Sequence, residues 1–228
     1  MALAAYKDLC LDVTDPERVA GFWAAVLGRR LEAAPDGAVL HGSRPEQTIW
    51  VNAVPEPKSV KHRVHLDVYA TSLADLERLG ATVLDTEAGG ERWTVMADPE
   101  GGEFCAFLRD LPGAERLHGI VVDSADEVAQ AEWWARVLGG EFVHQPGGWS
   151  TVQGVPGLPA TTVDFVPVPE AKTSKNRVHW DVLAPDLAAL LGAGATLLRA
   201  RATGRAWDVL ADPEGNEFCA FPVAPAAD

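Results

Sequence analysis

The sequence Arg-Val-His-Leu-Asp-Val at 63–68 recurs as Arg-Val-His-Trp-Asp-Val at 177–182. A second segment at 97–107, Ala-Asp-Pro-Glu-Gly-Gly-Glu-Phe-Cys-Ala-Phe, recurs at 211–221 with one substitution. Both pairs of segments are 114 residues apart. The chain is therefore a tandem duplication.

The first repeated segment alternates polar and apolar residues. Successive side chains of a β-strand point to opposite faces. We therefore expect Arg63, His65 and Asp67 to share one ionisable face, while the intervening aliphatic residues form an apolar face. The second copy predicts the same arrangement for Arg177, His179 and Asp181.

The composition is that of a well-packed globular protein of 228 residues, with 47% hydrophobic and 23% charged residues. No apolar run approaches the roughly 18 residues that a membrane helix requires. The formal net charge of −14 opposes binding to phosphate backbones and anionic lipid, so we expect neither nucleic acid nor membrane as a partner. Three cysteines without a paired framework, and an N-terminus without an export signal, predict a cytoplasmic protein.

Turn signals and periodicity predict two βαβββ modules in the first repeat. Alternating residues over 8–13 indicate a strand, and Asp15-Pro16-Glu17 begins a helix whose apolar stripe ends at Gly28. Three short strands follow, after which the order repeats from 63 to 107.

The same order of elements begins again at Leu117. The segment from Leu111 to Glu115 joins a turn dipeptide to polar residues, which is typical of a linker. We therefore predict two domains, 1–113 and 114–228, each with two βαβββ modules.

These features resemble the vicinal oxygen chelate superfamily, which includes glyoxalases, bleomycin-resistance proteins and extradiol dioxygenases. The likeness rests on the paired modules, the helix ending in Trp-Ala-Ala-Val-Leu-Gly (23–28) and the Asp-Pro-Glu-Gly turn before the last strand. It spans nearly the whole chain, twice, and is closest to glyoxalase-like domains. The resemblance implies an α+β fold in which the paired modules of each tandem domain form a half-open eight-stranded barrel. Helices would lie outside the barrel and a ligand cavity inside.

Metal-dependent relatives bind a divalent ion through His, Glu or Gln in the first and last strand of each module, and these positions look mostly emptied here. The resemblance places Asp8 or Cys10 at the first position, against Gly119 or Val121 in the second repeat. Arg63 and Arg177 stand where a histidine is usual, and Cys105 and Cys219 where a glutamate is usual. A guanidinium cannot coordinate a cation. We therefore predict a cavity with no metal and no other cofactor.

An improvised metal site is the alternative. His65, Asp67, Glu103 and Cys105 offer imidazole, carboxylate and thiolate donors that suit zinc-like ions. A fixed Arg63 beside the ion would weaken its binding by charge repulsion.

The duplicated His-x-Asp pairs suggest proton transfer. His65 would act as general base or acid, with Asp67 or Glu103 orienting the ring and raising its pKa through opposite charge, and the duplication predicts the same role for His179 beside Asp181. Arg63 would stabilise an anionic substrate or intermediate. The competing interpretation is a buried hydrogen-bonded network that closes the barrel floor without doing chemistry.

Further ligand-binding candidates surround these pairs. Lys61 and Lys175 lie on loops that either gate the cavity for an anionic ligand or are simply solvated. Trp93 and Trp207 either form an aromatic wall or fill the core. The cysteines are nucleophiles only if a partner depresses their pKa, and a core role is commoner. Strand parity and the duplication complete the ligand-binding set, which comprises Arg63, Arg177, Asp12, Asp123, Glu103, Glu217, Cys105, Cys219, Trp93, Trp207, Lys61 and Lys175.

Three functions remain open at this stage. We favour a small-molecule-binding protein with a polar, metal-free cavity that acts as a cofactor-independent isomerase or lyase. The alternatives are a resistance-type protein that sequesters its ligand and a divalent-metal lyase or dioxygenase. The sequence leaves open whether the chain is an enzyme, whether its ligand is anionic, and whether it is a monomer or a homodimer.

Overall fold

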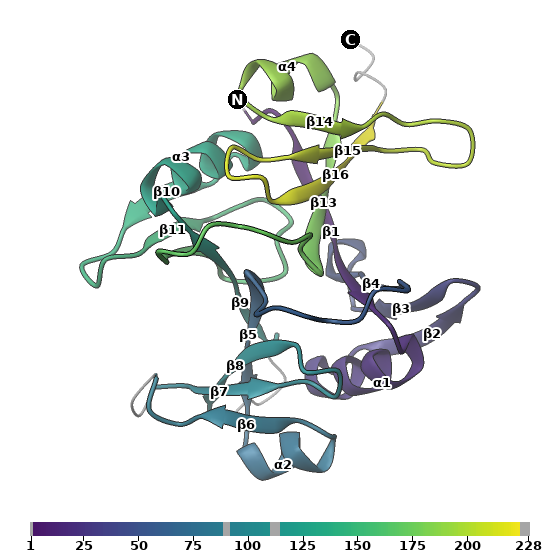
Figure 1. Ribbon diagram of the computed structural model, residues 1–228, viewed down its shortest axis with the longest axis vertical. Coiled ribbons are helices and arrows are strands. Elements are labelled where there is room, and N and C mark those ends of the chain that lie inside the picture. Colours follow the sequence, from purple (N-terminus) through teal and green to yellow (C-terminus); the bar gives the residue numbers. More distant parts are fainter. Residues whose placement is uncertain (1, 89–91, 110–114, 224–228) are drawn as a thin grey trace.

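The chain forms two eight-stranded mixed sheets in the computed structural model, which describes residues 2–88, 92–109 and 115–223. Both sheets are half-open, and short helices lie against them (Figure 1). The predicted α+β fold of paired βαβββ modules is confirmed. None of the described helices has the length and apolar character needed to cross a bilayer.

The first repeat contains two modules. Module 1 consists of β1 (Ala5–Val13), α1 (Pro16–Leu27), β2 (Arg30–Ala34), β3 (Gly37–His41), a 3-10 turn η1 (Pro45–Gln47) and β4 (Ile49–Ala53). Module 2 consists of β5 (Val64–Ala70), α2 (Leu73–Arg78), β6 (Thr82–Asp85), β7 (Thr94–Ala97) and β8 (Glu103–Leu108).

The second repeat contains two more modules in the same order. Module 3 consists of β9 (Leu117–Ser124), α3 (Glu127–Leu138), β10 (Glu141–His144), β11 (Ser150–Gln153) and β12 (Thr162–Pro167). Module 4 consists of β13 (Val178–Ala184), α4 (Leu187–Gly192), β14 (Thr196–Arg199), β15 (Asp208–Ala211) and β16 (Glu217–Pro222).

Each sheet is built from both sequence repeats. The first sheet has the order β14-β15-β16-β13-β1-β4-β3-β2 and joins modules 4 and 1. The second sheet has the order β10-β11-β12-β9-β5-β8-β7-β6 and joins modules 3 and 2. Our expectation that the two modules of one repeat share a barrel is therefore wrong. The boundary predicted near residue 113 lies outside the described residues.

Pairing of edge strands explains why each sheet combines modules from different repeats. The first strand of every module is an edge strand whose backbone groups need a partner. In the structure β1 pairs with β13, and β5 pairs with β9. Because the duplication makes modules 2 and 4 equivalent, local sequence cannot decide which of them module 1 will use. The connections β4 to β5 and β12 to β13 therefore run from one sheet to the other (Figure 1).

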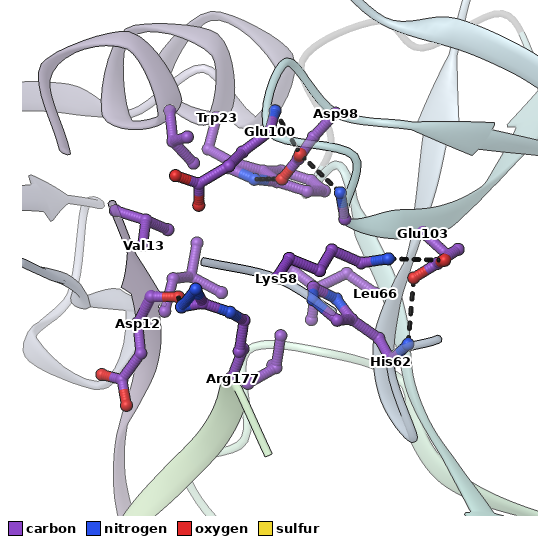
Figure 2. A pocket seen from close by; sticks show the side chains of 14 residues that line it. Asp12, Val13, Trp23, Lys58, His62, Leu66, Asp98, Glu100, Glu103 and Arg177 are labelled. Atoms are coloured by element: carbon purple, nitrogen blue, oxygen red, sulfur yellow. Dashed lines mark hydrogen bonds and ion pairs between the residues drawn. The ribbon is translucent and has the colours of Figure 1, made fainter. Parts of the chain in front are cut away.

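The modules of one repeat still touch, through a helix rather than a sheet. The apolar stripe of α1 is buried, as predicted, and its Trp23 ring lies 5.3 Å from Phe104 of β8. Trp23 Nε1 donates to Asp98 Oδ2 at 3.2 Å, and Glu100 Oε1 accepts from the backbone of Thr14 and Asp15 at the start of α1. Figure 2 shows Trp23 and Asp98 meeting in this way. The Asp-Pro-Glu-Gly turn therefore fastens module 2 to module 1.

The second repeat uses the same contacts around α3. Trp134 Nε1 donates to Asp212 Oδ2 at 3.1 Å, and Glu214 Oε1 accepts from the backbone of Ala125 and Asp126. The duplicated turn is therefore explained by packing between modules and requires no catalytic role.

Candidate functional site

One cluster of ionisable side chains lies on the face of the second sheet opposite its core. His65 and Asp67 come from β5 and Cys105 comes from β8, and we call this group the β5 cluster. Asp67 and Cys105 are register partners in a parallel pair. His65 Nε2 lies 3.6 Å from Asp67 Oδ1 and 3.6 Å from Cys105 Sγ. The structure thus brings together three residues that strand parity assigns to one face.

An equivalent cluster lies on the first sheet, and we call it the β13 cluster. It contains His179 and Asp181 of β13, Cys219 of β16 and Cys10 of β1. His179 Nε2 is 3.9 Å from both Asp181 Oδ1 and Cys219 Sγ. Cys10 is the register partner of His179, so this cluster draws on both sequence repeats.

A second carboxylate lies near the aspartate of each cluster. Burial, and after it the charge of Asp164, raises the pKa of Asp67 to about 7. Burial, and after it the charge of Asp8, raises the pKa of Asp181 to about 8. Like charges in a desolvated place favour keeping a proton on one of them. Each cluster therefore contains a carboxyl group able to gain or lose a proton near neutral pH.

The second carboxylate comes from different strands in the two sheets. In the first sheet the second carboxylate is Asp8 of β1, whose Oδ2 accepts a hydrogen bond from Trp50 Nε1 at 2.9 Å. The position equivalent to Asp8 in module 3 is Gly119, and a Cβ there would approach Asp164 Oδ2 at 3.5 Å. Asp164 of β12 accepts hydrogen bonds from Thr151 and Thr162 at 2.6 and 2.7 Å.

Three residues in or beside these clusters, Asp8, Cys10 and Asp164, were not among the site residues predicted from the sequence. From the sequence, Asp8 and Cys10 were named only because they occupy a position where metal-dependent relatives carry a ligand. Asp164 was not named. The alternation that places Asp12 on the cluster face also places Asp8 and Cys10 there. Asp164 has no counterpart in module 1, where Trp50 occupies its place, so the duplication gave no signal for it.

The histidines are neutral rather than activated. Burial lowers the pKa of His65 to about 4 and also lowers the pKa of His179. The expected net rise of the histidine pKa values is therefore wrong, because desolvation of the imidazolium outweighs nearby negative charge. The Nδ1 atoms of both rings are buried and have no hydrogen-bond partner among the described residues.

The cysteines are thiols at neutral pH. Burial is the largest cause that raises the pKa of Cys105 and of Cys219, and the adjacent aspartates add to it. Burial likewise raises the pKa of Cys10. A nucleophilic cysteine needs a depressed pKa, so this environment opposes that role.

The two arginines bind backbone oxygens of the other sequence repeat. Arg63 donates to the backbone oxygens of Glu170 and Asp123 at 2.6 and 2.7 Å. Arg177 donates to the backbone oxygens of Asp12 and Glu56. Arg63 and Arg177 precede their strands, and their long side chains reach the opposite connecting segment. Neither guanidinium makes a hydrogen bond or ion pair with the histidine or aspartate of its own strand among the described residues.

The lysines and glutamates hold the connecting segments in place. Lys58 and Lys172 pair with Glu103 and Glu217 of their own modules, each at 2.8 Å. Figure 2 shows Lys58 extended toward Glu103, which also accepts from the backbone N–H of His62 at 3.0 Å. The next lysines cross between modules, Lys61 to Asp123 at 2.6 Å and Lys175 to Asp12.

Two cavities lie beside these segments. The one drawn in Figure 2 has a volume of about 20 Å³, which is room for about one water molecule. The other has a volume of about 1180 Å³ and is bounded by both connecting segments and by the β14–β15 hairpin. Its lining includes Trp207 and Val209, and Val209 is the register partner of Cys219. This larger cavity therefore reaches the cluster face of the first sheet.

The two predicted tryptophans occupy equivalent, partly exposed places. Trp207 stacks on Phe221 with ring centroids 5.2 Å apart, and Trp93 lies 5.7 Å from Phe107. Phe107 and Phe221 follow the cysteines by two residues, so strand alternation places them on the cluster faces. Each cluster thus has an aromatic pair on its own face of the sheet.

The donor atoms of each cluster fit a divalent ion. One nitrogen, one oxygen and one sulfur lie within 4.8 Å of one another in His65, Asp67 and Cys105, and also in Cys10, His179 and Asp181. Asp67 Oδ1 and Asp181 Oδ1 are buried without hydrogen-bond partners among the described residues. Imidazole, carboxylate and thiolate together suit a zinc-like ion. Arg63 keeps its positive charge while it donates to the backbone oxygens of Glu170 and Asp123.

Comparison with known proteins agrees with this architecture. A family model described as a glyoxalase-like domain matches residues 8–107 and again 119–221. No curated protein sequence matches the chain.

Solved structures share the fold across the whole chain. Glyoxalase I from Zea mays superposes with a TM-score of 0.70 at 14% identity, over 96% of this chain and 92% of that one. A Bacillus subtilis protein provisionally named a dioxygenase gives 0.64 at 15% identity, over 98% and 87%. The cppA protein of Streptococcus pneumoniae gives 0.52 at 10% identity, over 96% and 100%. At these identities the likeness concerns the fold alone.

Proposed function

Because the chain belongs to the glyoxalase-like domain family of the vicinal oxygen chelate superfamily, we propose that it binds a small molecule against each cluster and moves a proton within it. The reaction class is a lyase or isomerase step that needs no cofactor. The observation that carries the proposal is the pairing, in each sheet, of a neutral imidazole with a buried carboxyl group whose pKa is about 7 or 8.

The two kinds of group take different roles. A catalytic acid or base works best when its pKa lies near the working pH, and the aspartates meet that condition. Asp67 or Asp181 would accept a proton from a carbon next to a carbonyl, leaving the electron pair on the carbonyl oxygen. The same carboxyl group then returns the proton to a neighbouring atom. His65 and His179 stay neutral and orient the ligand by hydrogen bonding.

Solvent deuterium exchange tests this step. A thermal-shift screen of small carbonyl acids first identifies a bound compound, since a ligand that binds the folded state raises Tm. Deuterium incorporation at the carbon beside its carbonyl is then followed by NMR. We expect exchange with the wild type and none with the double variant Asp67→Asn plus Asp181→Asn, while the Kd changes by less than about threefold.

The histidine double variant provides the comparison. His65→Gln plus His179→Gln should weaken binding of the same compound and slow exchange together, because these rings orient the ligand. Binding without exchange in the wild type would contradict proton transfer and favour a protein that sequesters its ligand. Equal exchange in wild type and aspartate variant would remove the proposed role of the carboxyl groups.

A divalent-metal lyase is the second candidate, favoured by the unpartnered donor atoms. His65, Asp67 and Cys105 would hold the ion in the second sheet, and Cys10, His179 and Asp181 in the first. A bound ion would supply Lewis-acid polarisation of a substrate oxygen. Native mass spectrometry and Tm after dialysis against Zn²⁺ test this without any activity assay. Binding of two ions, lost one at a time in Cys105→Ser and Cys10→Ser, would favour the metal enzyme.

A further inference from the structure

The two clusters lie near hairpins of opposite charge. Arg199 ends β14, and Arg201 and Arg205 follow it before β15. The equivalent sequence positions are Asp85, which ends β6, and Glu87 and Glu91. Equivalence follows from the offset of 114 residues that also relates Trp93 to Trp207. Three basic positions in one repeat are thus three acidic positions in the other, although the His-x-Asp segments are nearly identical.

The large cavity has a basic lining in an acidic protein. Seven basic and four acidic side chains border it, whereas the chain as a whole has a formal net charge of −14. Lys58, Lys61 and Lys175 pair with carboxylates. Arg63 and Arg177 donate to backbone oxygens. The acidic members are Asp12, Glu56, Asp123 and Glu170.

The other two cations of this lining are Arg199 and Arg205, and the one side-chain hydrogen bond found for them among the described residues stays within their own hairpin. Neither has a carboxylate oxygen within 4 Å in the described part of the chain, where Arg201 has Asp208 at 3.7 Å. Arg205 donates to the backbone oxygen of Ala200, and its Nε is buried without a partner among the described residues. Trp207 lines the same cavity and lies two residues further along.

One further pair of equivalent residues differs in the same direction. Lys7 lies over the Phe221 ring at 4.3 Å, and its equivalent in the second sheet is His118, which pairs with Tyr69 at 2.8 Å. Burial lowers the pKa of His118, so the second sheet lacks this positive charge at neutral pH. The opposite difference also occurs, because Arg92 and Arg109 lie over the rings of Trp93 and Tyr69 in the second sheet, each at 4.8 Å.

We propose that the first sheet binds a small flat organic anion between Trp207 and the Arg199–Arg205 pair, and that the second sheet does not accept this ligand. The inference rests on the proposed small-molecule function and adds its substrate class. A guanidinium forms charge-assisted hydrogen bonds with carboxylate or phosphonate oxygens, and the indole stacks on a flat ring. Near the β5 cluster, Asp85 and Glu87 repel such an anion.

Titration calorimetry with phenylphosphonate tests the proposal. This probe carries a ring and a double negative charge, and benzyltrimethylammonium is its cationic counterpart. We expect one phenylphosphonate per chain, weaker binding at higher salt because of screening, and much weaker binding of the cation. Absence of phenylphosphonate binding up to about 10 mM, or binding at two equal sites, would overturn the proposal.

Matched variants locate the site. Arg199→Gln plus Arg205→Gln should weaken phenylphosphonate binding by about tenfold or more and reduce its salt dependence. Arg201→Gln, on the same hairpin but outside the cavity lining, should leave the Kd within about twofold. All these side chains lie on a surface hairpin, so unchanged Tm values verify folding. An equal loss in Asp85→Asn plus Glu87→Gln, or no loss in the double arginine variant, would refute the assignment.

A further variant separates this inference from the proton-transfer proposal. Asp181→Asn should keep phenylphosphonate binding within about threefold, because the arginines rather than the cluster attract the anion. Loss of deuterium exchange with retained binding would leave the anion site intact. Self-association through the oppositely charged hairpins would instead appear as a concentration-dependent mass in sedimentation that the arginine variant abolishes, and would overturn the proposal.

Discussion

Single residues in the β5 cluster make stability depend on pH in opposite directions. An unfolded aspartate titrates near 3.8, whereas the pKa of Asp67 is about 7 in the folded chain. Between these values the folded state binds more protons, so the free energy of unfolding falls as pH rises. For His65 the pKa drops from 6.5 to about 4, so its contribution is lost as pH falls through that range.

The variant Asp67→Asn separates the two effects. Without the carboxylate, the loss of stability toward pH 7 should disappear. We expect the stability of the variant relative to wild type to increase by about 2 to 3 kcal/mol between pH 5 and pH 8. Urea unfolding at the two pH values measures this change. Asp164→Asn should produce a smaller gain, since its charge is a lesser cause of the raised pKa. A pH-independent difference would contradict the assignment.

The single substitution between the two Asp-Pro-Glu-Gly turns also has a local cause. A Cβ at Gly102 would lie 2.8 Å from Asp98 Oδ2 and 2.9 Å from the ring of His62. In the second repeat the equivalent residues are Asn216 and Asn176, and Asn176 Nδ2 donates to Asn216 Oδ1 at 2.9 Å. Two small amides thus replace a ring and a glycine in the same space.

A double-mutant cycle should show that positions 62 and 102 are energetically coupled. We expect Gly102→Asn alone to reduce the free energy of unfolding by about 1 to 3 kcal/mol through overpacking. Adding His62→Asn should recover most of that loss, because it recreates the arrangement of the second repeat. Urea unfolding of the four proteins gives the coupling energy. Strictly additive losses would show that the two positions do not share space.

Among the elements, helix α1 depends on a carboxylate from another module. Glu100 Oε1 accepts from the backbone N–H groups of Thr14 and Asp15, at 2.6 and 3.1 Å. It therefore adds negative charge at the positive end of the helix, where Asp15 already accepts from Arg18 N at 3.1 Å. The contact both stabilises α1 and joins the modules of the first repeat.

Removing the negative charge from this contact should destabilise the fold by a modest amount. Glu100→Gln is expected to lower the free energy of unfolding by about 1 kcal/mol at low ionic strength and by less in high salt. Glu17→Gln is the matched control, because Glu17 is an exposed carboxylate in the first turn of α1. Urea unfolding at two salt concentrations measures both. An equal effect of the two substitutions would mean that the cross-module contact has no special role.

For the whole molecule, each sheet requires both halves of the chain. The β1–β13 and β5–β9 pairings both join residues from different sequence repeats. A fragment of residues 1–113 retains the edges of β1 and β5 without the partners they have in the full chain. Unpaired edges of this kind favour association.

Separate expression of the two halves tests this organisation. We expect residues 1–113 alone to form a dimer in which β1 of one copy pairs with β5 of the other, or to remain unfolded. Mixed with residues 114–228, it should form a one-to-one complex with the circular dichroism spectrum of the full chain. Light scattering after size-exclusion chromatography measures the masses. A stable folded monomer of either half would contradict the shared sheets.

The duplication, the order of elements and the common face of His65, Asp67 and Cys105 can all be inferred from the sequence. All three follow from local periodicity, since strand alternation, helix stripes and capping residues depend on neighbours in the chain. The capped helix from Asp15 to Gly28 is as clear in the sequence as in the structure.

Which modules share a sheet depends on tertiary pairing of edge strands, and this pairing also sets the composition of each cluster. Edge strands of different repeats pair, which places Cys10 beside His179 and Asp164 near Asp67. The competing edge strands are chemically equivalent, so local sequence does not indicate which of them will pair. The protonation of the clusters also depends on the tertiary structure. Burial depends on what covers a side chain, so it reversed the roles expected for histidine and aspartate.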